Sequence, residues 1–189
     1  MAHNRIPSNC KKCELWQLSC YSCIDGRGNT INPKVIMIGE APGPEEAKKG
    51  EIFTGRAGKK LDEMIKSVVA ITYLTNMVKC RPASPTDSQG GFRTPTETEV
   101  ELCKPLLHQE LAAYNATVLM PLGNIALSGL IGFNHNGITK ELGKIRSVRI
   151  NFRDYIVIPN FHPSYICRNP EAESKFMKTL EKLNEYKTS

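Results

Sequence analysis

The sequence KVIMIGEAPG (residues 34–43) passes from an apolar run directly into a loop rich in glycine, proline and acidic residues. Its first part, residues 34–38, is typical of a short strand buried on both faces of a parallel sheet. In open α/β sheets, ligands bind beyond the carboxyl ends of the strands, so the following loop, residues 39–58, is a candidate functional site. A solvated turn is the alternative interpretation of the same glycines and prolines.

Three further apolar runs are rich in branched residues and end in polar or glycine-containing turns, at residues 71–76, 117–122 and 155–160. Segments with helical spacing of apolar residues separate the runs, at 57–69 and 96–114. Strands that alternate with helices indicate right-handed parallel crossovers. The sequence therefore predicts an α/β fold, a three-layer α/β/α sandwich with a central four-stranded parallel sheet.

The second of these helices has a clear start signal. Residues 94–97 (TPTE) supply a capping hydroxyl, a proline and an acidic first turn. A further helix is predicted after Gly123, and an amphipathic helix over 171–186. The composition of residues 132–153 favours a loop and a short strand pair, and that of residues 82–95 a long polar surface loop.

Length and composition are those of an ordinary globular protein. A chain of 189 residues with 40% hydrophobic content fits one domain, residues 1–189, on which an N-terminal cysteine-containing arm, residues 1–33, docks. No run approaches the ~18 apolar residues that span a bilayer, and the N-terminus does not resemble a secretory signal. We therefore expect an intracellular protein of the cytoplasm or nucleoid with no membrane partner. The formal charge of +6 only slightly favours a polyanionic partner.

The cysteines are seven, an odd number, which disfavours a disulfide framework in a reducing compartment and favours metal or cluster ligation. Two Cys-x-x-Cys pairs are followed by three single cysteines: Cys10 with Cys13, Cys20 with Cys23, and then Cys80, Cys103 and Cys167. Taken locally, the two pairs would suit a small zinc ribbon. The later cysteines would then be ordinary buried thiols.

Three loops at the predicted sheet edge carry a family resemblance. They are GEAPG (39–43), NMVKCRP (76–82) and NFHPSYICR (160–168), and the turn LGNIA (122–126) lies between the last two. Together they resemble the uracil-DNA glycosylase superfamily, most closely its family 4 enzymes, which carry a four-iron, four-sulfur cluster. The resemblance extends over residues 10–168 and is specific, because the loops and four cysteines occur in the family's order.

The resemblance implies which cysteines bind the [4Fe-4S] cluster. They are Cys10, Cys13, Cys80 and Cys103, and the first pair is favoured over the second because Cys13-Glu14-Leu15 matches the family's Cys-x-Leu continuation. Zinc in the same four thiolates is the alternative. Cys20, Cys23 and Cys167 are then interpreted as incidental thiols.

The resemblance also implies a base-binding pocket. Phe53 matches the aromatic ring that stacks on uracil, and Asn76 matches the asparagine whose carboxamide pairs with the base edge. His162 matches the histidine that donates to uracil O2 as negative charge develops there. Gly39 and Ala41 complete the substrate-binding set in the first loop. From the residue types alone, Phe53 could equally be core packing and Asn76 a turn residue.

Further roles follow from the same loops. Glu40 and Glu46 match the family's acidic positions, where a carboxylate orients the attacking water or stabilises the cationic sugar. Glu40 is favoured because the glycines and Pro42 around it restrict the loop. Ser164 is a candidate phosphate contact, Ile166 falls where related enzymes insert an apolar wedge, and Arg168 could grip the DNA backbone.

The resulting hypothesis is a monofunctional uracil-DNA glycosylase, which flips uracil out of DNA and hydrolytically excises it for base-excision repair. The DNA could be single- or double-stranded, and we expect a monomer; the sequence identifies no replication-clamp or polymerase partner. One departure is Phe92, which replaces a catalytic asparagine of the family before Arg93. The alternatives are therefore a weak or inactive DNA-binding or replication-accessory module, or a glycosylase for another deaminated base.

Overall fold

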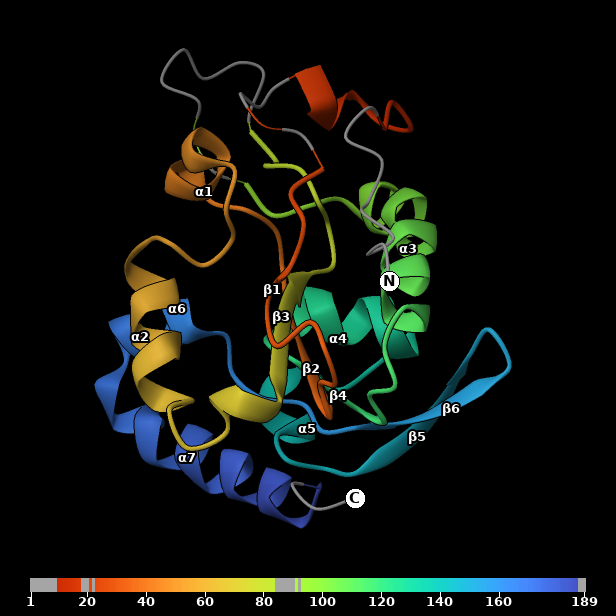
Figure 1. Ribbon diagram of the computed structural model, residues 1–189. Coiled ribbons are helices and arrows are strands. Elements are labelled where there is room, and N and C mark those ends of the chain that lie inside the picture. The colour runs from red at the N-terminus through yellow and green to blue at the C-terminus, as the bar shows by residue number, and fades with distance from the viewer. Residues whose placement is uncertain (1–9, 18–20, 22, 84–90, 92, 187–189) are drawn as a thin grey trace.

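A six-stranded sheet forms the centre of the computed structural model, which describes residues 10–17, 21, 23–83, 91 and 93–186 (Figure 1). The strand order is β1-β3-β2-β4-β6-β5. The strands are β1 (Arg27–Gly28), β2 (Val35–Gly39), β3 (Thr72–Asn76), β4 (Val118–Pro121), β5 (Arg146–Ile150) and β6 (Arg153–Val157).

The four inner strands are mutually parallel, which confirms the predicted parallel core. Two antiparallel edge strands, β1 and β5, were not predicted within it. β1 has only two residues, too few for a period, and β5 is largely exposed, so it lacks the apolar run of a buried strand. The predicted strand pair within residues 132–153 is instead β5 pairing with β6, and a short helix precedes β5.

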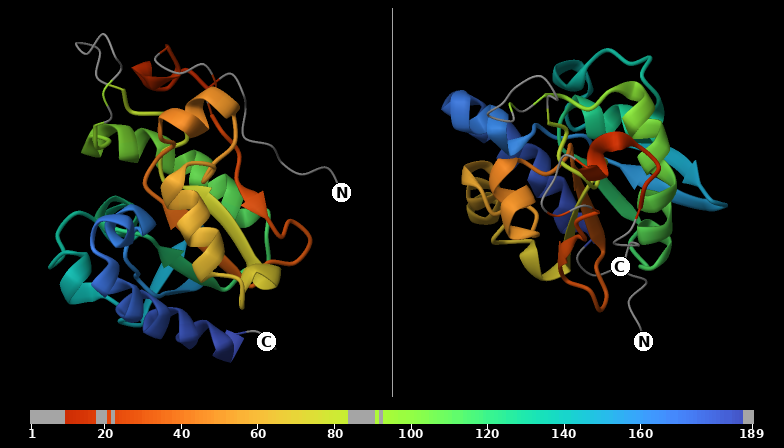
Figure 2. Two further views of the ribbon diagram at one scale, coloured as in Figure 1. Left: turned by 90° about the vertical axis from the view of Figure 1, so that its left-hand side faces the viewer. Right: turned by 90° about the horizontal axis from the view of Figure 1, so that it is seen from above.

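Helices cover both faces of the sheet, as the predicted three-layer sandwich requires (Figure 2). The α-helices are α1 (Pro44–Lys49), α2 (Arg56–Met64), α3 (Glu97–Ala112), α4 (Asn124–Ile131), α5 (Ile138–Glu141), α6 (Pro163–Arg168) and α7 (Glu173–Glu181). Short 3-10 helices lie at Glu14–Gln17, Val69–Ile71, Pro170–Ala172 and Lys182–Tyr186.

The alternation of side chains along β2 creates two cores. Ile36 and Ile38 pack toward α3 and α4, whereas Val35 and Met37 pack toward α2 and α7. All five residues of β2 are buried, which explains why this strand reads as a continuous apolar run rather than as an alternating pattern.

The predicted start of α3 is confirmed, whereas the predicted end of α2 is wrong. Thr96 caps α3 in a capping box, in which it accepts from the Glu99 N–H while the Glu99 carboxylate accepts from the Thr96 N–H. By contrast, α2 ends at Met64 rather than at residue 69. Residues 65–71 are needed to turn the chain into β3, and they do so through a 3-10 turn.

The last predicted strand, 155–160, begins and ends earlier, at Arg153–Val157. Pro159 has no N–H for a regular ladder. The chain nevertheless follows β4 to its end, because the Asn160 N–H donates to the Pro121 carbonyl at 2.9 Å. This extension carries the next loop to the same sheet edge as the ends of β2 and β3.

A buried ion pair lies beneath this edge. Lys79 is completely buried, and its ammonium group contacts the carboxylate of Glu110 in α3. The same carboxylate accepts hydrogen bonds from the hydroxyls of Tyr73, at 2.8 Å, and Thr75, at 2.7 Å. These contacts satisfy both charges and fix α3 against β3.

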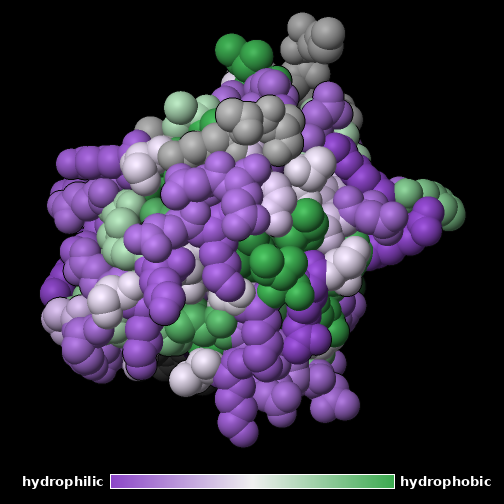
Figure 3. Space-filling model, turned by 90° about the horizontal axis from the view of Figure 1, so that it is seen from below, coloured by the Kyte–Doolittle hydropathy of each residue, from purple (hydrophilic) through white to green (hydrophobic). Residues whose placement is uncertain are grey.

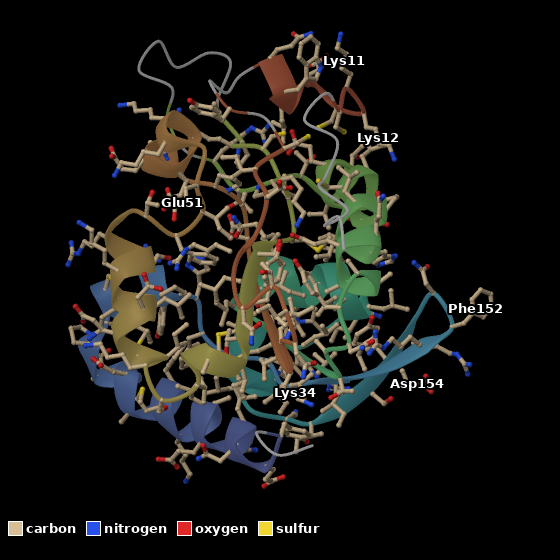
Figure 4. All side chains as sticks on the ribbon, in the orientation of Figure 1. Lys11, Lys12, Lys34, Glu51, Phe152 and Asp154 are labelled. Atoms are coloured by element: carbon tan, nitrogen blue, oxygen red, sulfur yellow. The ribbon has the colours of Figure 1, made fainter. Side chains whose placement is uncertain are left out.

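The surface is largely hydrophilic on the face seen from below, with hydrophobic side chains gathered near its centre (Figure 3). The β5–β6 hairpin projects from the body of the protein, and Phe152 lies at its tip (Figure 4). Among the residues that the structure describes, no helix is long and apolar enough to cross a membrane.

We predict that Glu110→Ala lowers the free energy of unfolding by about 3–5 kcal/mol, because it leaves the Lys79 charge buried without its partner. Denaturant unfolding measures this change. The control is Glu101→Ala, which removes an exposed pair with Lys104 on the same helix and should cost at most about 1 kcal/mol. Equal losses for the two variants would contradict the structural role of the buried pair.

Candidate functional site

A cleft of about 790 Å³ opens at the carboxyl ends of β2 and β3. Most of the sequence-predicted site residues line it: Glu40, Ala41, Glu46, Phe53, Asn76, His162, Ser164 and Arg168. Gly39 and Ile166 are not among its lining residues. Three loops that are distant in the sequence therefore meet at one site, as the topology of a parallel sheet allows.

Gly39 lies where two of the lining side chains approach the backbone. A Cβ atom at Gly39 would stand 2.4 Å from Asn76 Oδ1 and 2.7 Å from the ring of Phe53. Neither distance is compatible with a real side chain. Gly39 therefore contributes by having none, so that the carboxamide and the ring can both pack against the end of β2.

Asn76 presents its carboxamide to this cleft. It is the last residue of β3 and is 3% exposed, and its carboxamide makes no hydrogen bond with any other described residue. Its nitrogen and oxygen are not fully buried, so they face the open space of the cleft. Such a group is suited to binding a ligand that supplies a matching donor and acceptor.

Phe53 forms the adjacent wall in a backbone conformation that is uncommon for a residue other than glycine, with φ of 54°. Arg27 holds this loop, since its guanidinium donates to the Ile52 and Phe53 carbonyls and pairs with Asp62 at 2.8 Å. Sequence reasoning missed Arg27. Its position between two glycines ahead of a strand was the available signal, but it does not reveal the contact.

Gly58 supports the same loop from α2. A Cβ atom at Gly58 would lie 1.9 Å from the Phe53 carbonyl oxygen, so only glycine permits this approach. The position of the ring therefore depends on the unusual backbone conformation of Phe53 itself, on Arg27 and on Gly58. That combination is typical of a side chain held in place for a ligand.

His162 caps α6 and has a defined protonation pattern. Its Nδ1 accepts from the Ser164 N–H at 3.2 Å and lies 2.7 Å from Ser164 Oγ. Because an N–H can only donate, Nδ1 is the acceptor, and a neutral ring carries its proton on Nε2. Burial lowers the pKa of His162 to about 4, with a smaller contribution from Arg168. At neutral pH the ring is an uncharged Nε2–H donor.

The two predicted carboxylates differ in what they contact. Glu46 accepts a hydrogen bond from the Gly55 N–H at 2.9 Å, and so supports the start of α2. Glu40 has no such bond among the described residues, and burial raises its pKa above the ordinary value. The carboxylate of Glu40 is therefore the one that remains available to a ligand or to water.

The rim of the cleft differs from the predicted arrangement at one position. Ile166, proposed as an apolar wedge, is 1% exposed and packs in the core with Phe176, so its side chain does not reach the cleft. The neighbouring Tyr165 is 40% exposed, lines the cleft and packs on Phe161 with ring centroids 5.0 Å apart. In α6, Tyr165 faces the cleft and Ile166 faces the core, which the sequence alone did not indicate.

Basic side chains flank this rim. Arg168 lies at the end of α6, and Arg56 at the start of α2 donates to the Cys167 carbonyl at 3.4 Å. Both arginines line the cleft. Cys167 lies in α6 beside Arg56 and not among the other described cysteines, which is consistent with its interpretation as an incidental thiol.

The other described cysteines lie together on the opposite side of the β3 loop. Cys23, Cys80 and Cys103 are buried in one core cluster, and Cys10 and Cys13 pack against it. Lys11 and Lys12, which lie between Cys10 and Cys13 in the sequence, are at the outer edge of the molecule (Figure 4). The four cysteines that the family resemblance implies are thus brought together from three parts of the chain, and Cys23 joins them.

Backbone donors are directed at two of these sulfurs. The Lys79 N–H donates to Cys103 Sγ at 3.3 Å and the Cys23 N–H to Cys80 Sγ at 3.2 Å. A hydrogen bond from the Cys23 thiol lowers the pKa of Cys80. Burial raises the pKa of Cys103 to about 11. Thiols with amide donors in an apolar pocket fit an iron–sulfur group, whose sulfurs are stabilised by such hydrogen bonds.

The spacing of the thiols bears on which group they hold. In the described ranges, no three cysteine, histidine or carboxylate side chains are gathered closely enough to hold a single metal ion. The ligands of a four-iron cluster bind different iron atoms, and so stand further apart than the four ligands of one zinc ion.

One short segment joins the thiols to the cleft. Residues 76–80 carry Asn76 at one end and Cys80 at the other, and they continue the pairing of β3 with β2. The Met77 N–H donates to the Gly39 carbonyl and the Val78 N–H to the Glu40 carbonyl.

Two sequence predictions, on Cys20 and on Phe92 with loop residues 84–90, concern residues outside the described ranges.

Comparison with known proteins identifies similar chains. A family model described as "Uracil DNA glycosylase superfamily" matches residues 26–185. The Type-4 uracil-DNA glycosylase of Sulfurisphaera tokodaii is 32% identical over 94% of this chain and 80% of the relative. The enzymes of that name from Archaeoglobus fulgidus and Thermotoga maritima are 32% and 34% identical over 94% of this chain, and 87% and 88% of their own lengths.

We predict that the imidazole of His162 stays neutral, with its proton on Nε2, from pH 7 down to about pH 5. The reason is the burial that lowers its pKa to about 4, so that the cation forms only as the pH falls toward that value. Nitrogen-15 NMR of the histidine rings reports both tautomer and titration. A His162 midpoint near the ordinary value of 6.5, or a proton on Nδ1, would contradict the geometry.

Proposed function

Because this chain belongs to the uracil DNA glycosylase superfamily, we propose that it is a monofunctional glycosylase that hydrolytically excises uracil from DNA and leaves an abasic site. The observation that carries this proposal is the carboxamide of Asn76, which has no hydrogen-bond partner among the described residues and lies at the end of β3 beside the Phe53 ring. An enzyme acting on a base must take that base out of the stack and into such a pocket.

Asn76 and Phe53 recognise the base. The carboxamide offers a donor to uracil O4 and an acceptor to uracil N3–H, whereas cytosine presents the opposite pattern at both positions. The Phe53 ring, held by Arg27 and Gly58, provides a flat apolar face for stacking. Discrimination therefore depends on the amide meeting the base with its oxygen toward N3–H and its nitrogen toward O4.

His162 stabilises the leaving group. As the glycosidic bond breaks, negative charge develops on uracil O2, and the neutral Nε2–H can donate a hydrogen bond to it. Ser164 keeps the ring in this tautomer through the contacts at Nδ1. Because the ring is neutral, it can donate this hydrogen bond without first changing its protonation state.

Glu40 handles the water or the cationic sugar. Its carboxylate has no hydrogen-bond partner among the described residues, whereas Glu46 is engaged by Gly55. A half-buried carboxylate near the sugar stabilises oxocarbenium character and can orient the attacking water. Since burial raises its pKa, the ionised form is lost at a higher pH on acidification than for an exposed glutamate.

The rim binds the DNA strand. Arg56 and Arg168 provide positive charge for phosphates on either side of the flipped nucleotide. Tyr165 replaces Ile166 as the exposed side chain that meets the neighbouring bases, because an aromatic ring can stack where a base has left.

The thiols hold a [4Fe-4S] cluster through Cys10, Cys13, Cys80 and Cys103. When bound, this group joins the N-terminal arm, the β3 loop and α3, and so supports the segment that ends at Asn76. Zinc in the same four thiolates is the alternative. Metal analysis distinguishes the two: iron with acid-labile sulfide supports the cluster, and zinc without iron contradicts it.

The test is an oligonucleotide assay with uracil opposite guanine, uracil opposite adenine, and uracil in a single strand. The protein should release uracil and leave an alkali-labile site, and Asn76→Ala should slow single-turnover excision by about 100-fold or more. The matched control is Asn124→Ala, which changes an asparagine that also lines the cleft but bonds to the Ile138 N–H. This variant should keep most of the activity.

Three outcomes would contradict the proposal. No release with protein in excess over DNA indicates the DNA-binding or accessory module, which the replacement of the family asparagine by Phe92 makes a real alternative. Release of hypoxanthine in preference to uracil indicates another base. Unchanged excision by Asn76→Ala would show that this carboxamide does not read uracil.

A further inference from the structure

Cys23 is a fifth thiol in a site for which the proposed function requires four. Its Sγ lies 4.0 Å from Cys80 Sγ, and its N–H donates to the same sulfur. Both residues are 5% exposed, so the contact lies in the interior rather than on a free surface.

The backbone around this pair is already arranged as two adjacent strands of chain. The Ile24 N–H donates to the Lys79 carbonyl at 3.0 Å, one residue beyond Cys23 and one before Cys80. Disulfides require neighbouring backbones, with Cα atoms about 4.4–6.8 Å apart, and a sulfur–sulfur bond of about 2.0 Å. Here the backbones are adjacent, and the sulfurs, now 4.0 Å apart, must still approach each other to close the bond.

The conformation of Cys23 supports a specific rather than an incidental contact. Its φ of 52° lies in the left-handed region, which residues other than glycine rarely adopt. This conformation brings the N–H of Cys23 onto the Cys80 sulfur while its own thiol contacts the same atom. A strained residue that makes two contacts with one sulfur is held there by the surrounding fold.

We propose that Cys23 and Cys80 are a redox pair, which a peroxide oxidises to a disulfide in the metal-free protein. The inference rests on the proposed function only in that Cys80 is a cluster ligand. Closing the disulfide removes that ligand, so the protein accepts iron only after the bond has been reduced.

The chemistry balances with hydrogen peroxide as oxidant. Peroxide transfers one oxygen to the first sulfur, giving a sulfenic acid and one water. The second thiol attacks this sulfur, the sulfur–sulfur bond forms, and the hydroxyl leaves as a second water with the thiol proton. Two thiols have then lost two electrons, which peroxide has gained, and a dithiol reductant reverses the change by exchange.

Three other pairings are possible within the same cluster. Cys10 could join Cys13, and either of them could join Cys23, whose thiol also interacts with Cys10. The geometry assigns the bond to Cys80, because that sulfur is in direct contact with Cys23 and the two backbones are hydrogen-bonded beside it.

The experiment uses the full-length protein, freed of metal by a chelator under reducing conditions and then treated with one equivalent of hydrogen peroxide. Mass spectrometry of the intact chain should show the loss of two hydrogen atoms, and peptide mapping should find Cys23 joined to Cys80. Anaerobic addition of ferrous iron alone, without sulfide or thiol reductant, should give at least about tenfold less iron uptake than in the untreated protein. Dithiothreitol should restore the uptake.

Two variants separate this pair from other thiols. Cys23→Ala should keep iron uptake before oxidation and lose the cross-linked peptide after it. Cys167→Ala removes a cysteine outside the thiol cluster, and should behave like the wild type in every step. Circular dichroism checks that each variant folds.

The inference is overturned if peroxide joins Cys80 to another cysteine, if Cys23 is found unpaired, or if the oxidised protein takes up iron like the reduced one. Failure of the proposed cofactor looks different. In that case the reduced, untreated protein takes up no iron, while the peptide map still decides whether Cys23 and Cys80 pair.

Discussion

The pairing of the ends of β2 and β3 is the constraint on which the site depends. Register places Gly39 beside Asn76, and the backbone continues the pairing through Met77 and Val78. Because Gly39 has no side chain, the Asn76 carboxamide and the Phe53 ring both occupy the space above it. A polar base-reading group and an aromatic wall are thus held together by the sheet, which is more rigid than a loop could be.

The same segment connects recognition to the thiols. Only three residues separate Asn76 from Cys80, and one of them, Lys79, is tied to α3 by a buried ion pair and bonds through its N–H to Cys103. On the proposed function, the cluster therefore acts at a distance. It fixes the end of β3, and through it the carboxamide, while the chemistry belongs to Asn76, His162 and Glu40.

Much of this arrangement could be predicted from the sequence, because buried parallel strands read as continuous apolar runs and their ends must share one edge. The parallel core and the meeting of three loops followed from that rule. What could not be predicted depends on side-chain direction and on long-range contacts. In the short helix α6, Tyr165 rather than Ile166 faces the cleft. Arg27 contacts the Phe53 loop from an edge strand of two residues. The contact of Cys23 with Cys80 is also long-range, so the sequence did not indicate it.

The most direct test of the central claim is the single-turnover rate of uracil excision by Gly39→Ala. A methyl group at this position displaces Asn76 and Phe53 while leaving His162 and Glu40 chemically unchanged. With cooperative thermal unfolding retained, the rate should fall by about 100-fold, the loss expected from a misplacement of about 1 Å at a binding group. Excision at the wild-type rate would contradict the account, because the close packing above Gly39 would then be unnecessary for reading the base.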